Sequence, residues 1–559
     1  MLKFTKQHLY ILFVVIIISL PNLLLGVIGQ DSIVASSLKK IVFLTFSLAI
    51  VMLPLLFLKP KYYALIAVLL SPIIVFELYS VQLFKAPSSD EATALLFYTN
   101  SYETKELLKS SLKYVVIFLA LFMSLLFSAI KLKKNFKLEK SQKLLIATFV
   151  FIVFIGLFIR DFKIAKTFEK EFVTKVDLAY SLMRSKVKKT FPTGNFLKLV
   201  SAKKGIKSIK NYQDNIKNFK YNAFKKDTIP QQEIYVLVIG ETARKASFSL
   251  CGYDRNTNPL LSKKSNITSF NNVKSAANLT SIALPFIMTR ATPNNLTPKL
   301  SEPAIMAAFK ESGFKTYWLT NQAAGLDNVF AFYSRLSDYY KNIAVSIDVA
   351  KHDEALLPEL DIVLNDKSTT KKFIVIHTLG SHFRYNYRYP DNFEAFKPTL
   401  SKTLSLSGNS IKLKQENINS YDNSILYTDY ILSQIIDRVD KTNSISYMYY
   451  ISDHGENLYD DDKELLMHGF VNPSKYEIEV PLIIWNSNAY NDKYPSKTAN
   501  LKRFKDKKIT TTNAFHTLLD MANITYKEEN LQKSFVSKEF DTIQKRTLLS
   551  VDNRVLELD

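Results

Sequence analysis

Residues 445–456 read ISYMYYISDHGE, an apolar run followed directly by two acids, a histidine and a glycine. Such a run is typical of a buried strand. Three other apolar runs also end in polar residues: 234–240 before Glu241, 315–320 before Asn321, and 373–376 before His377. Ligands bind beyond the carboxyl ends of strands in open α/β sheets, so these polar residues can meet at one edge of a sheet. The sequence therefore predicts an enzyme with its site at that edge.

From about residue 230 onward, the chain alternates between strand-like and helix-like segments. Alternation of this kind predicts an α/β domain with a mainly parallel sheet covered by helices. We expect residues 230–559 to form this domain and to carry the chemistry. The single cysteine, Cys251, excludes an intramolecular disulfide, and a core of this size needs none.

Five stretches before residue 160 are apolar and nearly free of charge: 9–27, 41–58, 63–84, 114–130 and 144–159. Each is near the length that crosses about 30 Å of hydrocarbon as a helix. They predict a transmembrane domain of five helices in residues 1–160. The first stretch is interpreted as an anchor rather than a signal peptide, because four more follow it. Loop lysines favour a cytoplasmic N-terminus by ten to six, which places everything after the fifth helix outside the cytoplasm.

The chain is strongly basic, with 73 Lys and Arg against 51 Asp and Glu. Nucleic acid and anionic membrane are the common partners of such an excess. The apolar stretches favour the membrane, so we expect no nucleic-acid partner. Residues 160–226 hold 18 of the basic residues and only five acids. We expect residues 161–229 to form a basic amphipathic bridge on the lipid headgroups, with a solvated linker as the alternative.

Polar residues that follow two of the predicted strands suit a metal ion. Glu241 and Asp453 offer carboxylate oxygens and His454 offers an imidazole nitrogen, a mixture that suits Zn²⁺, with Mn²⁺ less favoured. Adjacent side chains on a strand point to opposite faces. The chain must therefore turn for Asp453 and His454 to share one ion, and Gly455 allows that turn. These residues predict a zinc site.

Thr280 precedes a helix-like stretch, where a threonine most simply caps the helix. A helix N-terminus also attracts phosphate, and a nearby metal would lower the pKa of the hydroxyl. The residues alone leave both interpretations open. Of the seven histidines, four lie in or just beyond the strand-end clusters: His377, His382, His454 and His468.

Several strings of the sequence, in this order and at this spacing, resemble one known family. They are Gly240-Glu-Thr-Ala-Arg244, Tyr253-Asp-Arg-Asn-Thr257, Leu284-Pro285, Trp318-Leu-Thr-Asn-Gln322, His377-Thr-Leu-Gly-Ser-His382, Ser452-Asp-His-Gly-Glu456 and His468-Gly469. Through these strings the chain is similar to the membrane-bound phosphoethanolamine transferases of the alkaline phosphatase/sulfatase superfamily. The resemblance implies a sulfatase-like fold for residues 230–559 and a phosphoethanolamine transferase activity.

The resemblance also implies a role for each residue of the site. The zinc ligands would be Glu241, Thr280, Asp453 and His454. Thr280 would also be the nucleophile that carries phosphoethanolamine. His382 and His468 would be catalytic groups at the donor or acceptor phosphate. The substrate-binding residues would be His382, His468, Asn321, His377 and Asn100, the last from an outer loop.

The implied reaction moves phosphoethanolamine from phosphatidylethanolamine, through phospho-Thr280, to a lipopolysaccharide component, either a core sugar or a lipid A phosphate. Ala276 and Phe286 stand where the disulfide-rich lipid A type has a cysteine pair, so the chain looks closer to the subset that acts on the lipopolysaccharide core. We expect a multi-pass monomer of the inner membrane with a periplasmic catalytic domain. Its product would weaken the attraction of cationic antimicrobial peptides to the surface.

Two alternatives stand beside this interpretation. An enzyme similar to lipoteichoic acid synthase would share the domain plan but transfer glycerol phosphate. A non-catalytic membrane sensor would bind lipid headgroups without zinc. A sulfatase is disfavoured, because sulfatases need a Cys or Ser matured to formylglycine, which Thr280 cannot supply.

Overall fold

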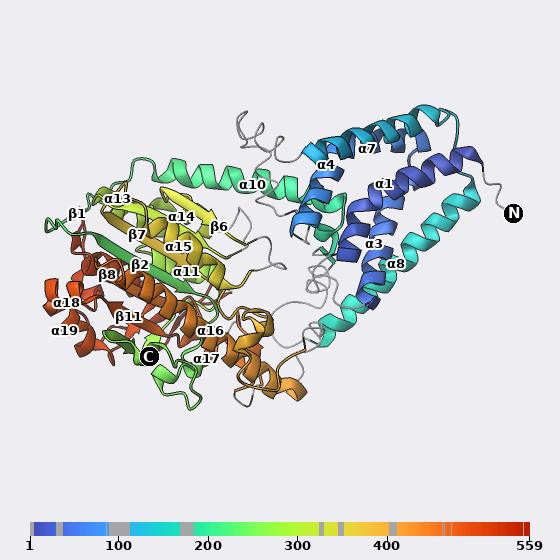
Figure 1. The fold of residues 1–559 in the computed structure, drawn as a ribbon. Coiled ribbons are helices and arrows are strands. Elements are labelled where there is room, and N and C mark those ends of the chain that lie inside the picture. The colour runs from blue at the N-terminus through green and yellow to red at the C-terminus, as the bar shows by residue number, and fades with distance from the viewer. Residues whose placement is uncertain are drawn as a thin grey trace. The chain divides into compact units, whose positions relative to one another are not determined.

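The computed structural model of the chain describes residues 5–28, 37–84, 87–88, 112–167, 183–184, 186–322, 329–344, 351–401, 411–460, 462, 464–470, 472–551 and 553–559. It divides into two compact units, Met1–Ile206 and Lys207–Asp559 (Figure 1). The boundary lies within helix α10 (Thr193–Ile216), which therefore contributes to both units. The predicted substrate-binding residue Asn100 lies outside the described residues.

Long apolar helices make up the first unit. They are α1 (Lys6–Ile28), α3 (Ser37–Met52), α4 (Pro60–Phe84), α7 (Leu112–Lys131) and α8 (Lys140–Thr167). Four described helices are long and apolar enough to cross a membrane: Lys6–Ile28, Pro60–Gln82, Tyr114–Lys131 and Lys140–Lys163. The remaining expected span, Lys40–Leu56, is shorter, at roughly 25 Å of helix. Four of the five predicted spans are thus present at full length in the described part of the chain.

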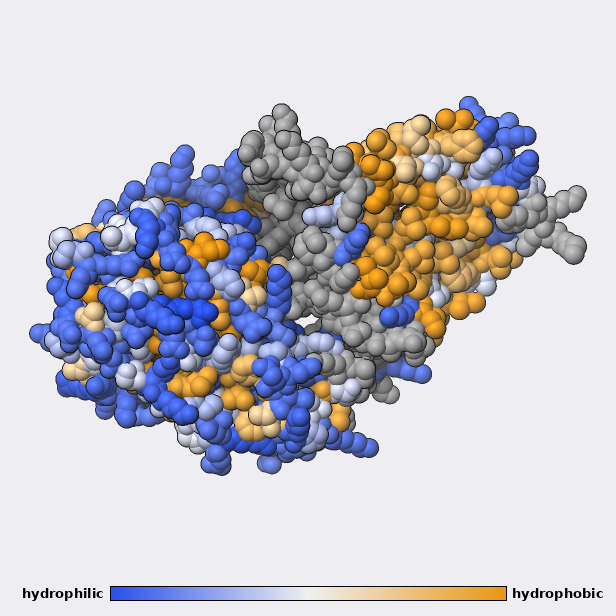
Figure 2. Space-filling model, viewed as in Figure 1, coloured by the Kyte–Doolittle hydropathy of each residue, from blue (hydrophilic) through white to orange (hydrophobic). Residues whose placement is uncertain are grey.

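Large apolar side chains cover the outside of this first unit. Leu69 of α4, Phe127 of α7 and Phe151 of α8 are each more than half exposed. Figure 2 shows hydrophobic residues gathered over these helices, whereas the visible face of the second unit is mostly hydrophilic. Apolar surface of this extent marks contact with lipid or with another protein, and helices of this length fit lipid.

Buried polar side chains tie these helices to the segment that enters α10. Asn22 of α1 exchanges two hydrogen bonds, both 2.9 Å, with the backbone of Phe191. Glu77 of α4 accepts hydrogen bonds of 2.7 Å from the Ser88 hydroxyl and the Asn195 amide. Ionisable groups among membrane helices need such partners. Both side chains therefore help to hold the first unit together.

The second unit contains a seven-stranded mixed sheet. In spatial order its strands are β3 (Ile267–Phe270), β11 (Leu482–Asn486), β8 (Ile445–Ser452), β2 (Glu233–Gly240), β7 (Lys371–His377), β5 (Lys315–Thr320) and β6 (Tyr339–Asn342). Adjacent strands from β8 to β6 are parallel, whereas β11 is antiparallel to both β8 and β3. The mainly parallel sheet expected from the sequence is therefore only part of a mixed sheet. The chain returns into β11 from the end where β8 finishes, without the crossover that a parallel neighbour requires.

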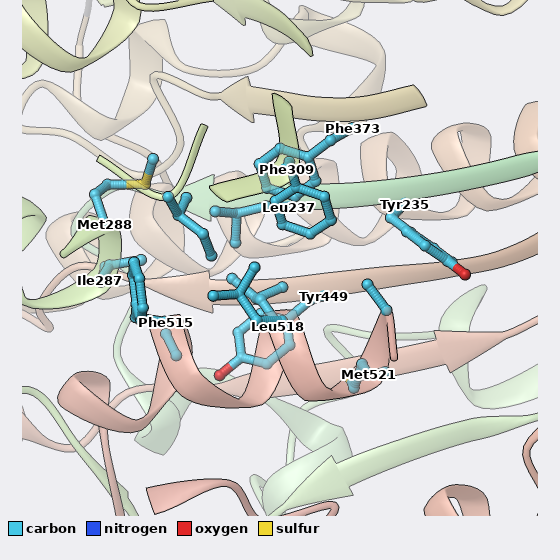
Figure 3. Packing of buried hydrophobic residues seen from close by; sticks show 14 of the residues in the cluster. Tyr235, Leu237, Ile287, Met288, Phe309, Phe373, Tyr449, Phe515, Leu518 and Met521 are labelled. Carbon is cyan, nitrogen blue, oxygen red and sulfur yellow. The ribbon is translucent and has the colours of Figure 1, made fainter. Parts of the chain in front are cut away.

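Alternate residues of the central strand β2 face two separate cores. Tyr235 and Leu237 pack with helices α11 (Thr280–Met288), α13 (Met306–Glu311) and α20 (Ala514–Met521). Val236 packs on the other face with helices α15 (Leu357–Leu364) and α16 (Lys414–Asp440). In the first core the rings of Phe309 and Phe373 stack with centroids 3.7 Å apart (Figure 3). A sheet buried on both faces explains why its strands read as continuous apolar runs.

Short elements complete the second unit. The helices are α12 (Pro298–Ser301), α14 (Val329–Ser334), α17 (Lys475–Ile478), α18 (Asn488–Lys493) and α19 (Pro495–Phe504). Two-stranded pairs are β1 (Phe224–Lys225) with β13 (Ile524–Thr525), β4 (Val273–Lys274) with β12 (Ile509–Thr510), β9 (Asn457–Leu458) with β10 (Leu466–Met467), and β14 (Thr547–Leu549) with β15 (Val555–Glu557). The pair β9–β10 belongs to the connection between β8 and β11, beyond the carboxyl end of the sheet.

Candidate active site

Two neighbouring strands and one helix bring the predicted metal ligands together. Strands β2 and β8 are parallel and in register, with Gly240 opposite Ser452 at their carboxyl ends. The residues that follow, Glu241 and Asp453, therefore leave the sheet at the same level. Thr280 is the first residue of α11. Three segments that are distant in sequence thus converge at one edge of the sheet, as the strand-end pattern predicts.

The distances among these residues are those of one compact cluster. The Thr280 hydroxyl lies 3.1 Å from Glu241 Oε1 and 3.2 Å from His454 Nε2. His454 Nε2 lies 3.3 Å from Asp453 Oδ2. One ligand atom from each of Glu241, Asp453 and His454 lies within 4.8 Å of the others, and all three residues are buried. A single small cation could contact all four side chains.

The two carboxylates carry an electrostatic penalty that a cation would relieve. Burial, together with the nearby charge of Asp453, raises the pKa of Glu241 to about 8. Asp453 Oδ1 accepts hydrogen bonds from the backbone of Thr242 and His454, whereas Oδ2 has no hydrogen-bond partner among the described residues. A buried carboxylate oxygen without a partner beside a second carboxylate is the environment of a metal ligand.

His454 is held in the form that binds a metal. Its Nδ1 lies 2.9 Å from the carbonyl oxygen of Gly455 and can only donate there, so Nε2 carries the lone pair that faces the cluster. Burial lowers the pKa of His454, which keeps the ring neutral. A Cβ at Gly455 would meet the Tyr476 carbonyl at 2.1 Å, so the turn requires glycine. Two carboxylates, a neutral imidazole and a hydroxyl fit Zn²⁺.

Two further histidines, His468 and His382, belong to the predicted site. The His468 ring is 4.0 Å from the His454 ring, and its Nδ1 lies 2.5 Å from Glu456 Oε2. Burial opposes a charge on His468, but Glu456, together with Glu241 and Asp453, outweighs burial and raises its pKa to about 9. Burial and the charges of Arg388 and His468 lower the pKa of His382 to about 3. The site thus offers one imidazolium and one neutral imidazole.

Two other predicted site residues, His377 and Asn321, are also buried. The buried ring of His377, at the end of β7, packs edge-on against Trp318 with centroids 6.2 Å apart. Burial lowers the pKa of His377 to about 4. The buried Asn321 amide donates hydrogen bonds to Asp353 Oδ1 at 2.9 Å and to the Lys351 carbonyl at 2.7 Å. Substrate contact by these two residues stays a prediction.

Three residues, Gln322, Thr242 and Glu456, make contacts in the site although the sequence predicts no role for them there. The Gln322 amide donates to Glu241 Oε2 at 3.1 Å, whereas the sequence points to its neighbour Asn321. Thr242 contacts the carboxylates of both predicted metal ligands, Glu241 and Asp453. Glu456 accepts hydrogen bonds from His468 and from the Tyr385 hydroxyl. All three stand inside the strings that follow the strands, but spacing alone does not reveal which way a side chain points once the strand has ended.

The chain is similar to known proteins over both units. A family model described as Sulfatase matches residues 233–524. Phosphoethanolamine transferase EptC of Escherichia coli (strain K12) is 28% identical over 477 residues, covering 81% of this chain and 78% of that protein. Kdo(2)-lipid A phosphoethanolamine 7''-transferase of Escherichia coli (strain K12) is 31% identical over 290 residues, covering 49% of this chain and 48% of that protein. The solved C-terminal periplasmic domain of EcEptC from Escherichia coli, a complex with Zn, matches with a TM-score of 0.53 and 28% identity, covering 59% of this chain and 92% of that one.

Proposed function

The chain belongs to the sulfatase family, whose model spans more than half of it, and on this premise we propose that it transfers phosphoethanolamine from phosphatidylethanolamine to a lipopolysaccharide component. The observation that carries the proposal is the position of Thr280. Its hydroxyl lies at the N-terminus of α11, within 3.3 Å of both Glu241 and His454. A hydroxyl in this place can take up a phosphoryl group, whereas it cannot be matured to the formylglycine of a sulfatase.

The proposed reaction has two displacement steps. In the first, the Thr280 oxygen forms a bond to the phosphorus of phosphatidylethanolamine, the bond from phosphorus to the glycerol oxygen breaks, and diacylglycerol leaves with a proton. In the second, an acceptor oxygen forms a bond to the same phosphorus, the bond to Thr280 breaks, and the acceptor proton returns to the threonine. Covalent catalysis divides one difficult transfer into two easier ones.

The residues of the site have separate tasks in this reaction. Glu241, Asp453, His454 and Thr280 would hold zinc, which when bound lowers the pKa of the threonine hydroxyl and withdraws charge from the phosphate. The imidazolium of His468 would neutralise charge on the phosphodiester. His382, whose burial keeps its imidazole neutral, would line the donor or acceptor phosphate and form hydrogen bonds with it. The N-terminus of α11 favours an anion beside Thr280.

The first unit would bring the lipid donor to the enzyme. We propose that all five apolar segments span the inner membrane, the shorter Lys40–Leu56 included, with the N-terminus in the cytoplasm. The catalytic unit would then lie in the periplasm, which is supported by the relative whose solved domain is described as C-terminal and periplasmic. Residues 161–229 would form the basic bridge at the headgroups. We propose that the protein acts as a monomer.

The acceptor would be an anionic glycolipid. One relative is named for transfer to Kdo(2)-lipid A, and EptC is named only for the group that it transfers. For this chain we propose a lipopolysaccharide core sugar or a lipid A phosphate. The added ammonium would reduce the negative charge of the surface and weaken the binding of cationic peptides. Transfer of glycerol phosphate from phosphatidylglycerol is the alternative.

The decisive experiment follows the group on Thr280. Purified protein in detergent is incubated with phosphatidylethanolamine or with phosphatidylglycerol and examined by peptide mass spectrometry. We expect a phosphoethanolamine adduct on Thr280 with the first lipid and none with the second. Thr280→Ala should abolish the adduct and the transfer while keeping most of the zinc, and Thr280→Ser is the matched control that retains a hydroxyl. An adduct on another residue, or full activity of Thr280→Ala, would refute the covalent step.

A further inference from the structure

Thr242 has a backbone conformation that β-branched residues rarely adopt. Its φ is +60°, in the left-handed region, directly after the predicted metal ligand Glu241. A Cβ is disfavoured in this region, and glycine would adopt it without strain. Strained backbone of this kind persists only where surrounding contacts determine it, and it concentrates at functional sites.

The left-handed turn lets one residue contact both metal-binding carboxylates. The Thr242 backbone N–H donates to Asp453 Oδ1 at 3.1 Å. Its hydroxyl donates to Glu241 Oε1 at 2.8 Å. Gln322, the other side chain that contacts a carboxylate from outside the cluster, reaches only Glu241 in the described part of the chain. Thr242 therefore fixes the position of Glu241 relative to Asp453.

Contacts from a helix and a neighbouring strand hold this turn in place. The buried hydroxyl of Tyr421, on α16, donates to the Thr242 carbonyl at 2.7 Å and accepts from the Arg244 N–H at 2.8 Å. The intervening Ala243 N–H donates to the Ser452 hydroxyl at 2.9 Å. The backbone groups of the turn are thus satisfied by side chains rather than by a continued strand.

We propose that Thr242 is a positioning residue for the metal, and that Tyr421 acts through it. Two buried carboxylates repel one another, and a residue that donates one hydrogen bond to each of them holds them at the separation that one cation needs. By occupying Asp453 Oδ1, Thr242 leaves Oδ2 to face the cation beside His454 Nε2, 3.3 Å away. Mutation of a residue that hydrogen-bonds to a metal ligand typically weakens metal binding by about 10- to 100-fold. This inference rests on the proposed zinc site and adds to it a residue that does not contact the cation.

Zinc affinity of the full-length protein in detergent tests the inference. The zinc Kd is measured by chelator competition for the wild type, for Thr242→Val, which removes the hydroxyl and keeps the branched shape, and for Thr242→Ser, which keeps the hydroxyl. We expect Thr242→Val to weaken zinc binding by about 10-fold or more, and Thr242→Ser to stay within about threefold of the wild type. Thr242→Val with wild-type affinity would overturn the role of Thr242.

Two further measurements separate positioning from simple stability. The thermal melting of each zinc-free protein is recorded, and a purely structural residue would lower melting while leaving the zinc Kd unchanged, which would contradict the inference. Tyr421→Phe removes the hydroxyl that holds the turn and keeps the ring, so zinc binding should weaken in this variant too. If Thr242→Val does not fold, unchanged affinity in Tyr421→Phe decides against the inference. A wild type that binds no zinc would refute the proposed metal site itself.

Discussion

Zinc binding to this protein should displace a proton from Glu241, and the pH dependence of affinity should show it. The pKa of Glu241 is raised by burial and by Asp453 from the ordinary 4.5 to about 8. At about 1.4 kcal/mol per pH unit, this rise corresponds to roughly 5 kcal/mol against placing both charges in the cluster without a cation. At pH 7 the zinc-free protein therefore carries a proton on Glu241, and zinc must compete with it.

This competition predicts a break in the pH profile. Because zinc displaces the proton of Glu241 below pH 8, zinc affinity should rise about tenfold more per pH unit below pH 8 than above it. The stability of the zinc-free protein should show the opposite trend. A carboxyl whose pKa is raised on folding stabilises the folded state fully below pH 4.5, and this contribution is lost as the pH rises through 8.

Chelator competition between pH 6 and pH 9, corrected for protonation of the chelator, measures the profile. Another group that loses a proton on zinc binding, such as Thr280, adds the same slope on both sides of pH 8 and leaves the break in place. Thr280→Ala is therefore the matched control and should keep the break. A profile with one slope throughout would refute the assignment of this proton to Glu241 in the zinc-free protein.

Two other substitutions test residues at the edge of the site and in the first unit. Glu456→Gln should lower the pKa of His468 from about 9, so the alkaline limb of the kcat/KM profile should shift down by about one pH unit or more. The control Tyr385→Phe removes a hydroxyl that donates to Glu456 but keeps the carboxylate, so it should leave the limb in place. An unchanged limb in Glu456→Gln would contradict the role of the carboxylate. Glu77→Ala should leave Ser88 and Asn195 without their acceptor and lower the free energy of unfolding by about 1–3 kcal/mol. The loss should appear as a lower melting temperature in detergent and faster trypsin cleavage, with Leu69→Ala at an exposed position of the same helix as the control. Wild-type melting and cleavage would show that these contacts add nothing to stability.

The strand-end pattern predicted that the polar residues after the strands converge at one edge of the sheet, because it depends on local sequence. Glu241 and Asp453 follow apolar runs directly, and parallel strands in register bring such positions together. Thr280 has no such signal, since a threonine before a helix is equally a cap. Its place in the site came from the resemblance to a known family. The backbone conformation of Thr242, and with it the orientation of its side chain, could not be predicted. Its positive φ is held by a hydrogen bond from Tyr421, which lies 179 residues away in the sequence.

The fold was predictable to a similar extent and for the same reason. Long apolar runs and alternating segments are local features, and they led to the apolar helices and to the α/β unit. A strand near residues 481–485 was expected, but the antiparallel direction of β11 was not, because its residues resemble those of its parallel neighbours. Its direction is set by the connection after Ser452, which stays at the carboxyl end of the sheet to build the site. A strand that returns from the same end must run antiparallel.

The charges of the site indicate why a cation would govern substrate binding as well as nucleophile activation. Without one, the buried pair Glu241 and Asp453 faces an incoming phosphodiester with like charge, and protonation of Glu241 removes only part of it. His468 offsets only part of this charge, because its imidazolium is also paired with Glu456. A divalent cation would neutralise both carboxylates and leave the helix N-terminus and His468 to face the phosphate. Loss of the metal should therefore weaken donor binding, not only the chemical step, so in Asp453→Asn, which perturbs the metal but keeps the shape of the side chain, KM should rise together with the fall in kcat.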